Sequence, residues 1–446
     1  MNLSEIEIFT AHTYPRFGQN KKNEIVRLLY ETIKREKCSL KEIIPVLPQT
    51  KHFSTIKNFL LKIRYPHLSK KERFTNVLLT PIKMHPEYVF KPHPYFHFTP
   101  NHIYIEKAVI RSSLSLRVQS LFPHAEAHEI TTYKDHVSKQ AYSVLNYNKR
   151  REDIFIIKEN FSYHLNCPCS TDAVCCQYDI LNIGYGCPYD CSYCFLQGYT
   201  NSPGILLPAN IHAFFNELNM IRGYRRFGSG QFTDSLALDH ISSYSQDIID
   251  YFKNKPEFIF EFKTKSDNVN LLLKKQPSKN IIVSWSLNPE NIINQSEWYT
   301  APLKNRFSAA QACQEKGYGL GFHFDPIIHY PNWDRDYHEV IQLLSEKIDP
   351  EQIRWISLGC LRMPVKLKSV IENRFPQDPI LNGELLTDFD EKLRYHPRLR
   401  KMIYEKMVIW LKNLLPDVKI YLCMESHQMY KECGIPLPEN LYFFLR

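Results

Sequence analysis

Three cysteines stand close together in the run from Gly186 to Gln197, which reads Gly-Cys-Pro-Tyr-Asp-Cys-Ser-Tyr-Cys-Phe-Leu-Gln. Their spacing, C-x3-C-x2-C, places the thiolates of Cys187, Cys191 and Cys194 on one short loop. Thiolates are the soft ligands that iron–sulfur clusters select. A cubane [4Fe–4S] cluster held by three protein ligands keeps one iron open for another molecule. The spacing therefore predicts a [4Fe–4S] centre with a free coordination position.

A structural zinc site is the alternative. It needs a fourth ligand and usually shows paired C-x2-C spacings. No second C-x2-C occurs in this chain, although nearby cysteines would be able to complete a zinc site. Four cysteines lie upstream of the loop, and a second metal site there is a further hypothesis: Cys167, Cys169, Cys175 and Cys176.

The cysteine distribution also bears on the cellular compartment. Seven of the 12 cysteines in this 446-residue chain fall between Cys167 and Cys194. Such clustering favours metal ligation in a reducing compartment over a disulfide framework. The N-terminus has no basic segment followed by an apolar run, and no apolar stretch is long enough to span a membrane. The sequence predicts a cytoplasmic protein without a membrane anchor.

The positive charge is concentrated at the N-terminal end. Residues 1–100 hold 17 Lys and Arg against 8 Asp and Glu, a surplus of +9 that equals the net charge of the whole chain. A basic segment attached to a neutral body favours a polyanionic partner, most simply nucleic acid. The alternative is a solvated helical surface with surplus lysines.

Local patterns divide the chain into three parts: residues 1–100, 101–165 and 166–446. The first part reads as helical. Its expected features are a helix over Asn23–Lys37, a capping box at Ser39, a helix over Ser54–Arg64 with Ser54 as N-cap, and a linker over Pro86–Pro100. The second part is an α/β lead-in with a strand at Ile103–Glu106, a helix at Ser113–Phe122 and a link over Arg150–Lys158.

Strands and helices alternate in the third part. A short strand, Tyr178–Gly184, leads into the cysteine loop, and five more follow: Arg226–Phe232, Glu257–Lys265, Ile281–Asn288, Gly319–Ile327 and Ile353–Leu361. Helical patterns separate them near His240–Phe252, Asn268–Leu273, Leu303–Lys316 and Asp336–Glu346. Six such units predict an α/β fold, a partial (β/α)6 barrel with a parallel sheet and outer helices. A long helix over Glu391–Leu415 and a last strand, Val418–Met424, complete the pattern.

Polar residues gather where these strands end. In barrels of this kind, function lies at the carboxyl ends of the strands. The residues expected there are Gln231, Thr233, Asp234, Ser235, Lys263, Lys265, Ser286, Asn288, His323, Asp325 and Cys360. Their joint placement is a stronger signal than any one of them.

The strand, cysteine loop and helix, with Tyr193 and Phe195 flanking the third cysteine, resemble the radical S-adenosylmethionine superfamily. Further segments occur in the order seen in spore photoproduct lyase and its relatives: Thr233–His240, Phe262–Lys265, Trp285–Asn288, Gly319–Phe322 and Lys392–Tyr395. This resemblance covers about residues 101–446. It implies a TIM-like partial barrel, a [4Fe–4S] cluster and S-adenosyl-L-methionine as cofactors, and a 5′-deoxyadenosyl radical that reverses a thymine dimer lesion in DNA.

The resemblance also implies roles for individual residues. Cys187, Cys191 and Cys194 would hold the cluster. Lys265, Ser286 and Asn288, with Ser235 as a weaker candidate, would lie near S-adenosylmethionine. Arg394 and Tyr395 would face the lesion, where the planar fork of an arginine suits a phosphate.

Two departures from the family pattern concern the return of a hydrogen atom to the product radical. The family has a cysteine just before the Asp-His segment, but this chain reads Ser-Gly-Gln-Phe-Thr over 229–233. The tyrosine that follows the third cluster cysteine is here Phe195, which has no O–H to give. Tyr193 and Cys360 are the candidate replacements, and a buried structural role is the alternative for Cys360.

Three functions therefore stay open. The favoured one is a radical enzyme that repairs or modifies a pyrimidine lesion in DNA, supplied with electrons by a donor such as flavodoxin or ferredoxin. A radical enzyme acting on RNA or another substrate is the second, and a non-catalytic metal-binding, nucleic-acid-binding protein is the third. The oligomeric state does not follow from the sequence.

Overall fold

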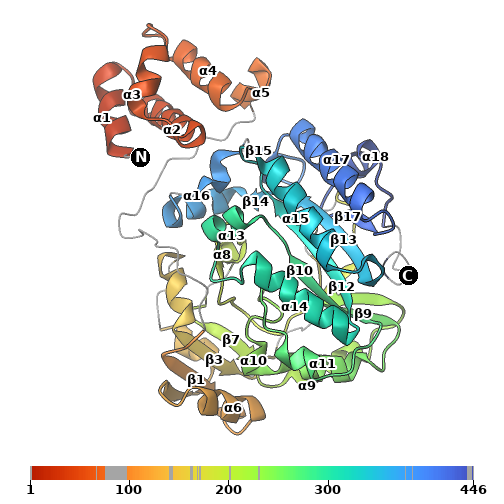
Figure 1. The fold of residues 1–446 in the computed structure, drawn as a ribbon. Coiled ribbons are helices and arrows are strands. Elements are labelled where there is room, and N and C mark those ends of the chain that lie inside the picture. Colours follow the sequence, from red (N-terminus) through yellow and green to blue (C-terminus); the bar gives the residue numbers. More distant parts are fainter. Residues whose placement is uncertain are drawn as a thin grey trace. The chain divides into compact units, whose positions relative to one another are not determined.

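The computed structural model describes residues 3–66, 68–75, 98–139, 144–160, 164–167, 169, 172–199, 202–229, 232–376, 378–383, 385–438 and 444. The chain divides into two units, drawn in Figure 1. The helical unit comprises Met1–Lys91, Ile328–Pro331 and Cys360–Arg400. The barrel unit comprises Pro92–Ile327, Asn332–Gly359 and Lys401–Arg446. None of the described helices has the length and apolar character needed to cross a membrane.

An eight-stranded sheet forms the centre of the barrel unit, in the order β17-β13-β12-β10-β9-β8-β5-β4. The strands are β4 (His164–Asn166), β5 (Tyr178–Leu181), β8 (Arg225–Gly228), β9 (Phe258–Thr264), β10 (Ile281–Ser286), β12 (Gly319–Ile327), β13 (Ile353–Cys360) and β17 (Ile420–Leu422). The pairings from β5 to β12 and between β13 and β17 are parallel, whereas β4 runs antiparallel to β5. All six strands expected from the sequence lie consecutively in this sheet.

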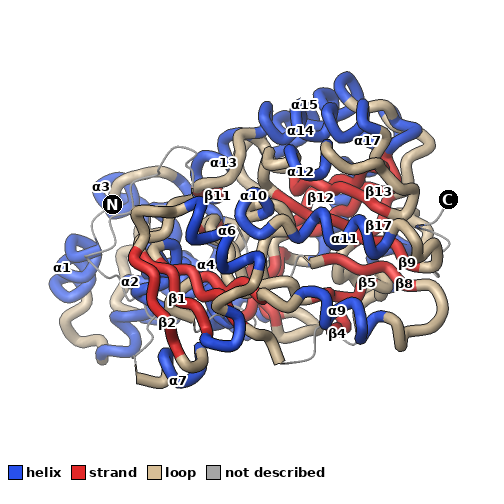
Figure 2. Tube along the Cα trace, turned by 90° about the horizontal axis from the view of Figure 1, so that it is seen from below, coloured by secondary structure: helices blue, strands red, loops and turns tan. Residues whose placement is uncertain are grey.

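Helices connect the strands, as the alternation predicts. They are α8 (Leu196–Tyr199), α9 (Ile211–Leu218), α10 (Asp239–Ser242), α11 (Tyr244–Phe252), α12 (Asn270–Leu273), α13 (Glu290–Ser296), α14 (Leu303–Lys316) and α15 (Trp333–Lys347). Figure 2 shows α14 and α15 on one face of the sheet. Helix α14 buries Phe307 and Ala310, and its C-cap is Gly317, whose φ of 100° is the left-handed conformation that favours glycine.

A second, smaller parallel sheet has the order β2-β1-β3-β7. Its strands are β1 (His102–Glu106), β2 (Glu126–Ile130), β3 (Asp153–Ile157) and β7 (Ile205–Pro208), and α6 (Ser113–Leu121) and α7 (Tyr133–Val137) accompany them. The expected link over Arg150–Lys158 is wrong, because β3 is an inner strand of this sheet. A short apolar run such as Ile-Phe-Ile-Ile does not reveal from sequence alone which strands it will join.

The helical unit begins with α1 (Leu3–Thr13), α2 (Gln19–Glu36), α3 (Leu40–Ile43), α4 (Phe53–Arg64) and α5 (Lys70–Thr75). The capping box at Ser39 is confirmed, since Glu42 accepts the Ser39 backbone N–H at 2.7 Å. The expected N-cap at Ser54 is wrong: His52 is the N-cap of α4. Of the expected linker Pro86–Pro100, residues 86–97 lie outside the described residues.

The later part of the helical unit corrects another expectation. The predicted helix over Glu391–Leu415 is instead the strand β16 (Lys392–Tyr395) followed by α17 (Pro397–Leu414). Strand β16 lies between β14 (Arg362–Pro364) and β15 (Leu385–Thr387) in an antiparallel sheet, and α16 (Val365–Arg374) follows β14. Glu391 has a φ of 57°, which breaks any helix there, and Pro397 suits the first turn of α17.

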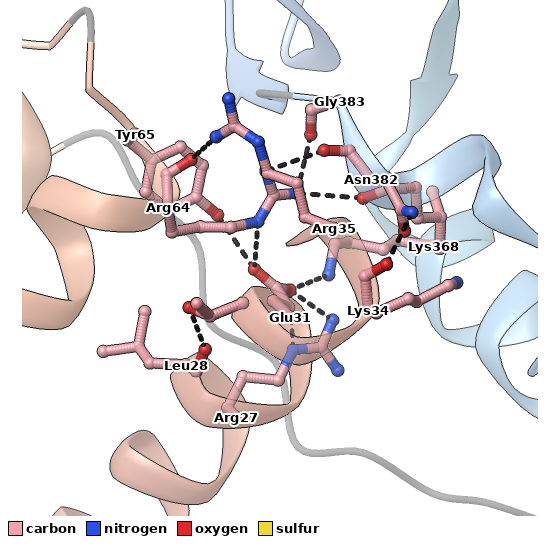
Figure 3. Close-up of polar contacts among 12 residues, drawn as sticks. Arg27, Leu28, Glu31, Lys34, Arg35, Arg64, Tyr65, Lys368, Asn382 and Gly383 are labelled. Atoms are coloured by element: carbon pink, nitrogen blue, oxygen red, sulfur yellow. Dashed lines mark hydrogen bonds and ion pairs between the residues drawn. The ribbon is translucent and has the colours of Figure 1, made fainter. Parts of the chain in front are cut away.

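Buried charges join the N-terminal helices to the 360–400 segment within the helical unit (Figure 3). Glu31, on α2, is 6% exposed. Its carboxylate accepts hydrogen bonds from Arg27 and Lys368 at 2.8 and 2.9 Å. Arg64 donates to the carbonyls of Leu381, Asn382 and Gly383 at 2.7–3.0 Å. These contacts place 360–400 with the first helices, whereas the sequence pattern had grouped it with the barrel.

Replacing Glu31 by glutamine is expected to destabilise the helical unit by about 3 kcal/mol. The change removes the carboxylate beside buried Arg64, whereas Arg27 and Lys368 keep their pairs with Glu372. Breaking a buried ion pair by removing one partner costs about 3–5 kcal/mol. Urea unfolding and limited proteolysis within 360–400 would measure it. The control is Glu24→Gln on the same helix, because the half-buried Glu24–Lys57 pair should cost less than about 1 kcal/mol. Equal costs for the two variants would contradict the prediction.

Candidate active site

The three-cysteine loop begins where β5 ends and includes the short strand β6 (Asp190–Cys191). Cys191 is 7% exposed, and Cys187 and Cys194 are half-buried. Burial raises the pKa of all three thiols, and the neighbouring Cys194 raises the pKa values of Cys187 and Cys191 further. As thiolates, these groups therefore need compensating positive charge, which a bound metal centre supplies.

The donor set separates the two candidate metal centres. A structural zinc site is closed by four protein ligands, whereas the loop supplies three thiols, from Cys187, Cys191 and Cys194. A cubane cluster held by three thiolates keeps one iron open for another molecule. Three thiolates on one loop therefore fit a [4Fe–4S] cluster better than a structural zinc ion.

Two buried side chains satisfy the carbonyl groups of this loop. Gln197 Nε2 donates to the carbonyls of Cys191, Ser192 and Cys194 at 3.2, 2.8 and 3.2 Å. Arg150 is 1% exposed and donates to the carbonyls of Cys187, at 3.0 Å, and Tyr189. With its carbonyls held in this way, the loop presents its thiols from a fixed backbone. Arg150 carried no recognisable signal in the sequence.

A buried polar network, the Glu297 network, lies against the loop. It consists of Tyr193, Asn288, Glu297, Arg306 and Tyr337. Cys191 pairs with Glu297 through the antiparallel strands β6 and β11 (Glu297–Trp298). Tyr193 O–H donates to Glu297 Oε1, which also accepts from Asn288 Nδ2 at 2.8 Å. Arg306 Nη2 donates to Glu297 Oε2 at 2.6 Å, and Tyr337 O–H donates to Asn288 Oδ1 at 2.6 Å.

The network sets the charges beside the thiols. Burial alone would raise the pKa of Glu297, but Arg306 and Lys265 outweigh it and lower the pKa to about 2. Lys265 Nζ lies 5.7 Å from the centre of the Tyr193 ring, and Arg306 Nη1 donates to the Ser286 carbonyl at 2.8 Å. Lys265, Ser286, Asn288 and Tyr193 thus lie in one region of the barrel unit. The roles of Lys265, Ser286 and Asn288 near S-adenosylmethionine stay predictions. Glu297 and Arg306 were missed, since neither lies in a recognisable motif.

Ser235 lies in a neighbouring group of hydrogen bonds. It is 6% exposed, accepts from the Lys263 backbone N–H at 2.9 Å and accepts from Ser229 Oγ at 2.7 Å. Asp234 accepts from Thr264 Oγ1 at 2.5 Å and from the Lys265 backbone N–H at 2.8 Å. These bonds join the loop after β8 to the end of β9. Gln231, also expected at this edge, lies outside the described residues.

His323 lies deeper than the sequence suggests. Its Nε2 is 2.7 Å from Glu261 Oε1 and its Nδ1 is 2.5 Å from Ser357 Oγ, all in the barrel interior. Glu261 also accepts from Arg226 Nη2 at 2.8 Å. The group is a buried ion network of the sheet and has no exposed edge that a substrate would touch.

Stability is expected to fall between about pH 6.5 and pH 4, in part because of His323. Burial and Lys263 lower its pKa to about 4, despite the attraction of Glu261. The unfolded state therefore binds more protons than the folded state in this range, and the free energy of unfolding decreases as pH falls. Urea unfolding at several pH values would measure the slope. His323→Gln should flatten the slope, and a slope unchanged by this variant would contradict the prediction.

The family match to this chain covers the part that contains the cysteine loop and the Glu297 network. The profile of the spore photoproduct lyase family matches residues 98–410. This chain belongs to the spore photoproduct lyase family. The predicted family is confirmed, and the N-terminal helices lie before the matched region.

Curated spore photoproduct lyases are distant relatives in sequence. The enzyme of Bacillus subtilis is 24% identical over 325 residues, which are 69% of this chain and 91% of that enzyme. The enzyme of Clostridium acetobutylicum is 24% identical over 202 residues, 44% of this chain and 60% of that enzyme. The match to the clostridial enzyme therefore spans less than two thirds of its length.

Solved structures confirm the fold. Spore photoproduct lyase complexed with dinucleoside spore photoproduct is 20% identical, with a TM-score of 0.64 over 73% of this chain and 99% of that chain. A double mutant of spore photoproduct lyase with bound AdoMet and the same dinucleoside gives the same TM-score and coverage. The α/β partial barrel predicted from the sequence is the fold of this family.

The residues that the family resemblance assigns to the lesion lie in the helical unit. Arg394 is 1% exposed, and its guanidinium bonds the Asp390 carboxylate at 2.5 and 3.0 Å. The Tyr395 hydroxyl accepts the His329 backbone N–H at 3.0 Å. A phosphate would have to compete with Asp390 for the fork of Arg394. The role of both residues at the lesion remains a prediction.

The hydrogen-return candidates occupy different environments. Tyr193 is half-buried in the Glu297 network, whereas Phe195 is 37% exposed and packs edge-on against Tyr199 at 5.8 Å. Cys360 is 2% exposed at the end of β13. Neither candidate role is tested by this arrangement.

The four upstream cysteines differ in exposure. The sulfurs of Cys167 and Cys169 lie 3.4 Å apart. Cys176 is buried beside Trp355 and Tyr421, whereas its neighbour Cys175 is exposed. A metal bound there would have only the first pair as preassembled ligands, so a second metal site remains a hypothesis.

Proposed function

We propose that this chain is a radical S-adenosylmethionine enzyme that repairs or modifies a pyrimidine photoproduct in nucleic acid, with DNA as the favoured substrate. The observation that carries the proposal is the trio of thiols on one loop whose backbone is held by Arg150, Gln197 and the pairing with Glu297. The location of this trio at the end of β5 in a member of the spore photoproduct lyase family supports it.

Each part of the site has a defined task in this proposal. Cys187, Cys191 and Cys194 hold a [4Fe–4S] cluster, which together with bound S-adenosyl-L-methionine supplies a 5′-deoxyadenosyl radical. Lys265, Ser286 and Asn288 lie near S-adenosylmethionine, and Ser235 lines the next strand end. The Glu297 network keeps Asn288 and Tyr193 in one orientation and excludes water from the side of the loop that it covers.

Anaerobic incubation with reductant, S-adenosylmethionine and ultraviolet-irradiated DNA tests the proposal. Formation of 5′-deoxyadenosine together with recovery of thymine is the expected result. 5′-Deoxyadenosine without lesion reversal would support the radical chemistry and reject the substrate. Protein that stays colourless after iron–sulfide reconstitution would reject the whole proposal and favour a non-catalytic metal-binding protein.

This chain lacks the cysteine and the tyrosine that the family pattern has for returning a hydrogen atom to the product radical. Their absence from the expected positions favours a second candidate, a radical enzyme that modifies RNA or another substrate. Phe195 carries no exchangeable hydrogen, and no thiol lies in 229–233. Reaction in deuterated water distinguishes the routes, because a thiol or phenol donor would place solvent deuterium in the product. Loss of that label in Cys360→Ala or Tyr193→Phe would identify the donor.

The helical unit is the proposed contact to nucleic acid outside the lesion. It holds 25 Lys and Arg against 14 Asp and Glu, a net charge of +11, whereas the barrel unit has 31 against 33. Each phosphate neutralised contributes about −0.9 to the slope of log affinity against log salt concentration on duplex DNA. A salt series on DNA and RNA, comparing wild type with a variant in which the exposed lysines Lys41, Lys51 and Lys62 are replaced by glutamine, would measure the contribution of this unit. The proposed electron donor is a small redox protein such as flavodoxin or ferredoxin.

A further inference from the structure

The smaller sheet of the barrel unit carries a group of metal-ligating side chains far along the chain from the cysteine loop. Strands β1 and β2 are parallel, with His102 opposite Glu126 and Tyr104 opposite His128. Since side chains alternate across a strand, His102, Glu126 and His128 lie on one face of this sheet. Their ligand atoms all lie within 4.8 Å of one another.

The neighbours of this trio hold its rings in a ligating arrangement. Asp153, opposite His102 on β3, has Oδ1 2.8 Å from His102 Nδ1. With a carboxylate at that distance, Nδ1 carries the hydrogen and Nε2 keeps its lone pair. A histidine whose other nitrogen bonds a carboxylate is the usual arrangement behind a metal ligand. The His128 ring stacks on Tyr104 at 5.0 Å with 22° between the planes, which limits its rotation.

A plain surface ion pair explains this arrangement less well. His128 Nε2 is 3.5 Å from Glu126 Oε2, and the two side chains are 41% and 72% exposed. An exposed pair of this kind contributes less than about 1 kcal/mol. The His128–Glu126 pair alone does not explain why His102, oriented by Asp153, lies on the same face of the sheet.

We propose that His102, His128 and Glu126 bind one divalent transition-metal ion, with Zn²⁺ as the best fit, and that Asp153 orients His102. Two imidazoles and one carboxylate form a common zinc ligand set, with a water in the fourth position. Ligand atoms around zinc lie about 3.3 Å apart, so separations of up to 4.8 Å close by at most about 1.5 Å. The ion would join the edge strand β2 to β1. The site is independent of the proposed radical chemistry.

The test titrates the full-length protein, carrying its reconstituted iron–sulfur cluster, with Zn²⁺ against a chromophoric chelator. One zinc ion beyond those bound by thiols is expected, and it should raise the melting temperature. His128→Ala should lose this ion. Asp153→Asn should weaken binding by about 10–100-fold without abolishing it. The matched control is His124→Ala, an exposed histidine just before β2 that lies outside the trio.

Co²⁺ separates this site from the cysteines. Nitrogen and oxygen ligands give weak visible bands, whereas thiolate ligands add an intense sulfur-to-cobalt charge-transfer band. The expected difference spectrum between wild type and His128→Ala shows only the weak bands. Identical zinc stoichiometry and cobalt spectra in these two proteins would overturn the proposal. Circular dichroism of both without metal would check that the variant folds.

Discussion

Replacing Cys191 by alanine is expected to lower 5′-deoxyadenosine formation by more than about three orders of magnitude, a barrier change of about 4 kcal/mol. The variant removes one of three thiolates from the loop, and two ligands hold a cluster poorly. The backbone pairing of β6 with β11 does not involve the side chain, so the fold should persist. Iron and acid-labile sulfide content after anaerobic reconstitution, together with 5′-deoxyadenosine yield, would measure the effect.

The matched control is Cys38→Ser. Cys38 is a partly buried cysteine of the helical unit, outside the loop. It should leave iron content and 5′-deoxyadenosine yield unchanged. Wild-type iron and sulfide levels in Cys191→Ala would refute the assignment of this thiol as a cluster ligand.

Glu297→Gln is expected to destabilise the barrel unit by about 3–5 kcal/mol, because it leaves the buried cation of Arg306 without its carboxylate. The same change leaves one amide oxygen in place of the two carboxylate oxygens that accept from Asn288, Tyr193 and Arg306, and it should weaken S-adenosylmethionine binding. Because the pKa of Glu297 is low, its contribution to the free energy of unfolding depends on pH. Its stabilising contribution is present above about pH 4.5 and is lost as pH falls towards about 2.

Urea unfolding and equilibrium dialysis with S-adenosylmethionine would measure the two effects of Glu297→Gln. The control Asp250→Asn breaks exposed pairs with Lys253 and Lys275 and should cost less than about 1 kcal/mol. The double variant Glu297→Gln, Arg306→Met removes the orphaned cation and should recover part of the stability. A Glu297→Gln variant as stable as Asp250→Asn would contradict the role of the network.

The sequence predicted the bounds of those helices and strands that are set by their own residues and immediate neighbours. Helix α14 begins and ends at the predicted residues, Leu303 and Lys316, because Gly317 stops it. Strand β12 also has its predicted bounds, Gly319–Ile327. The wrong predictions concern segments whose secondary structure depends on partners far away in the sequence. Lys392–Tyr395 has a composition compatible with a helix and becomes a strand only because β14 and β15 pair with it.

The sequence by itself determined the candidate ligands and the scaffold of this protein: three thiols in a C-x3-C-x2-C loop, and the strand–helix alternation that brings polar residues to the strand ends. Both are local patterns, and a local pattern is readable without knowing the partner. Only the tertiary structure decided which charges surround the thiols and which strands share a face. Arg150, Glu297 and the His102–Glu126–His128 trio come from segments far apart in the chain or from strand register, and pairing across such distances leaves no periodic trace in the sequence.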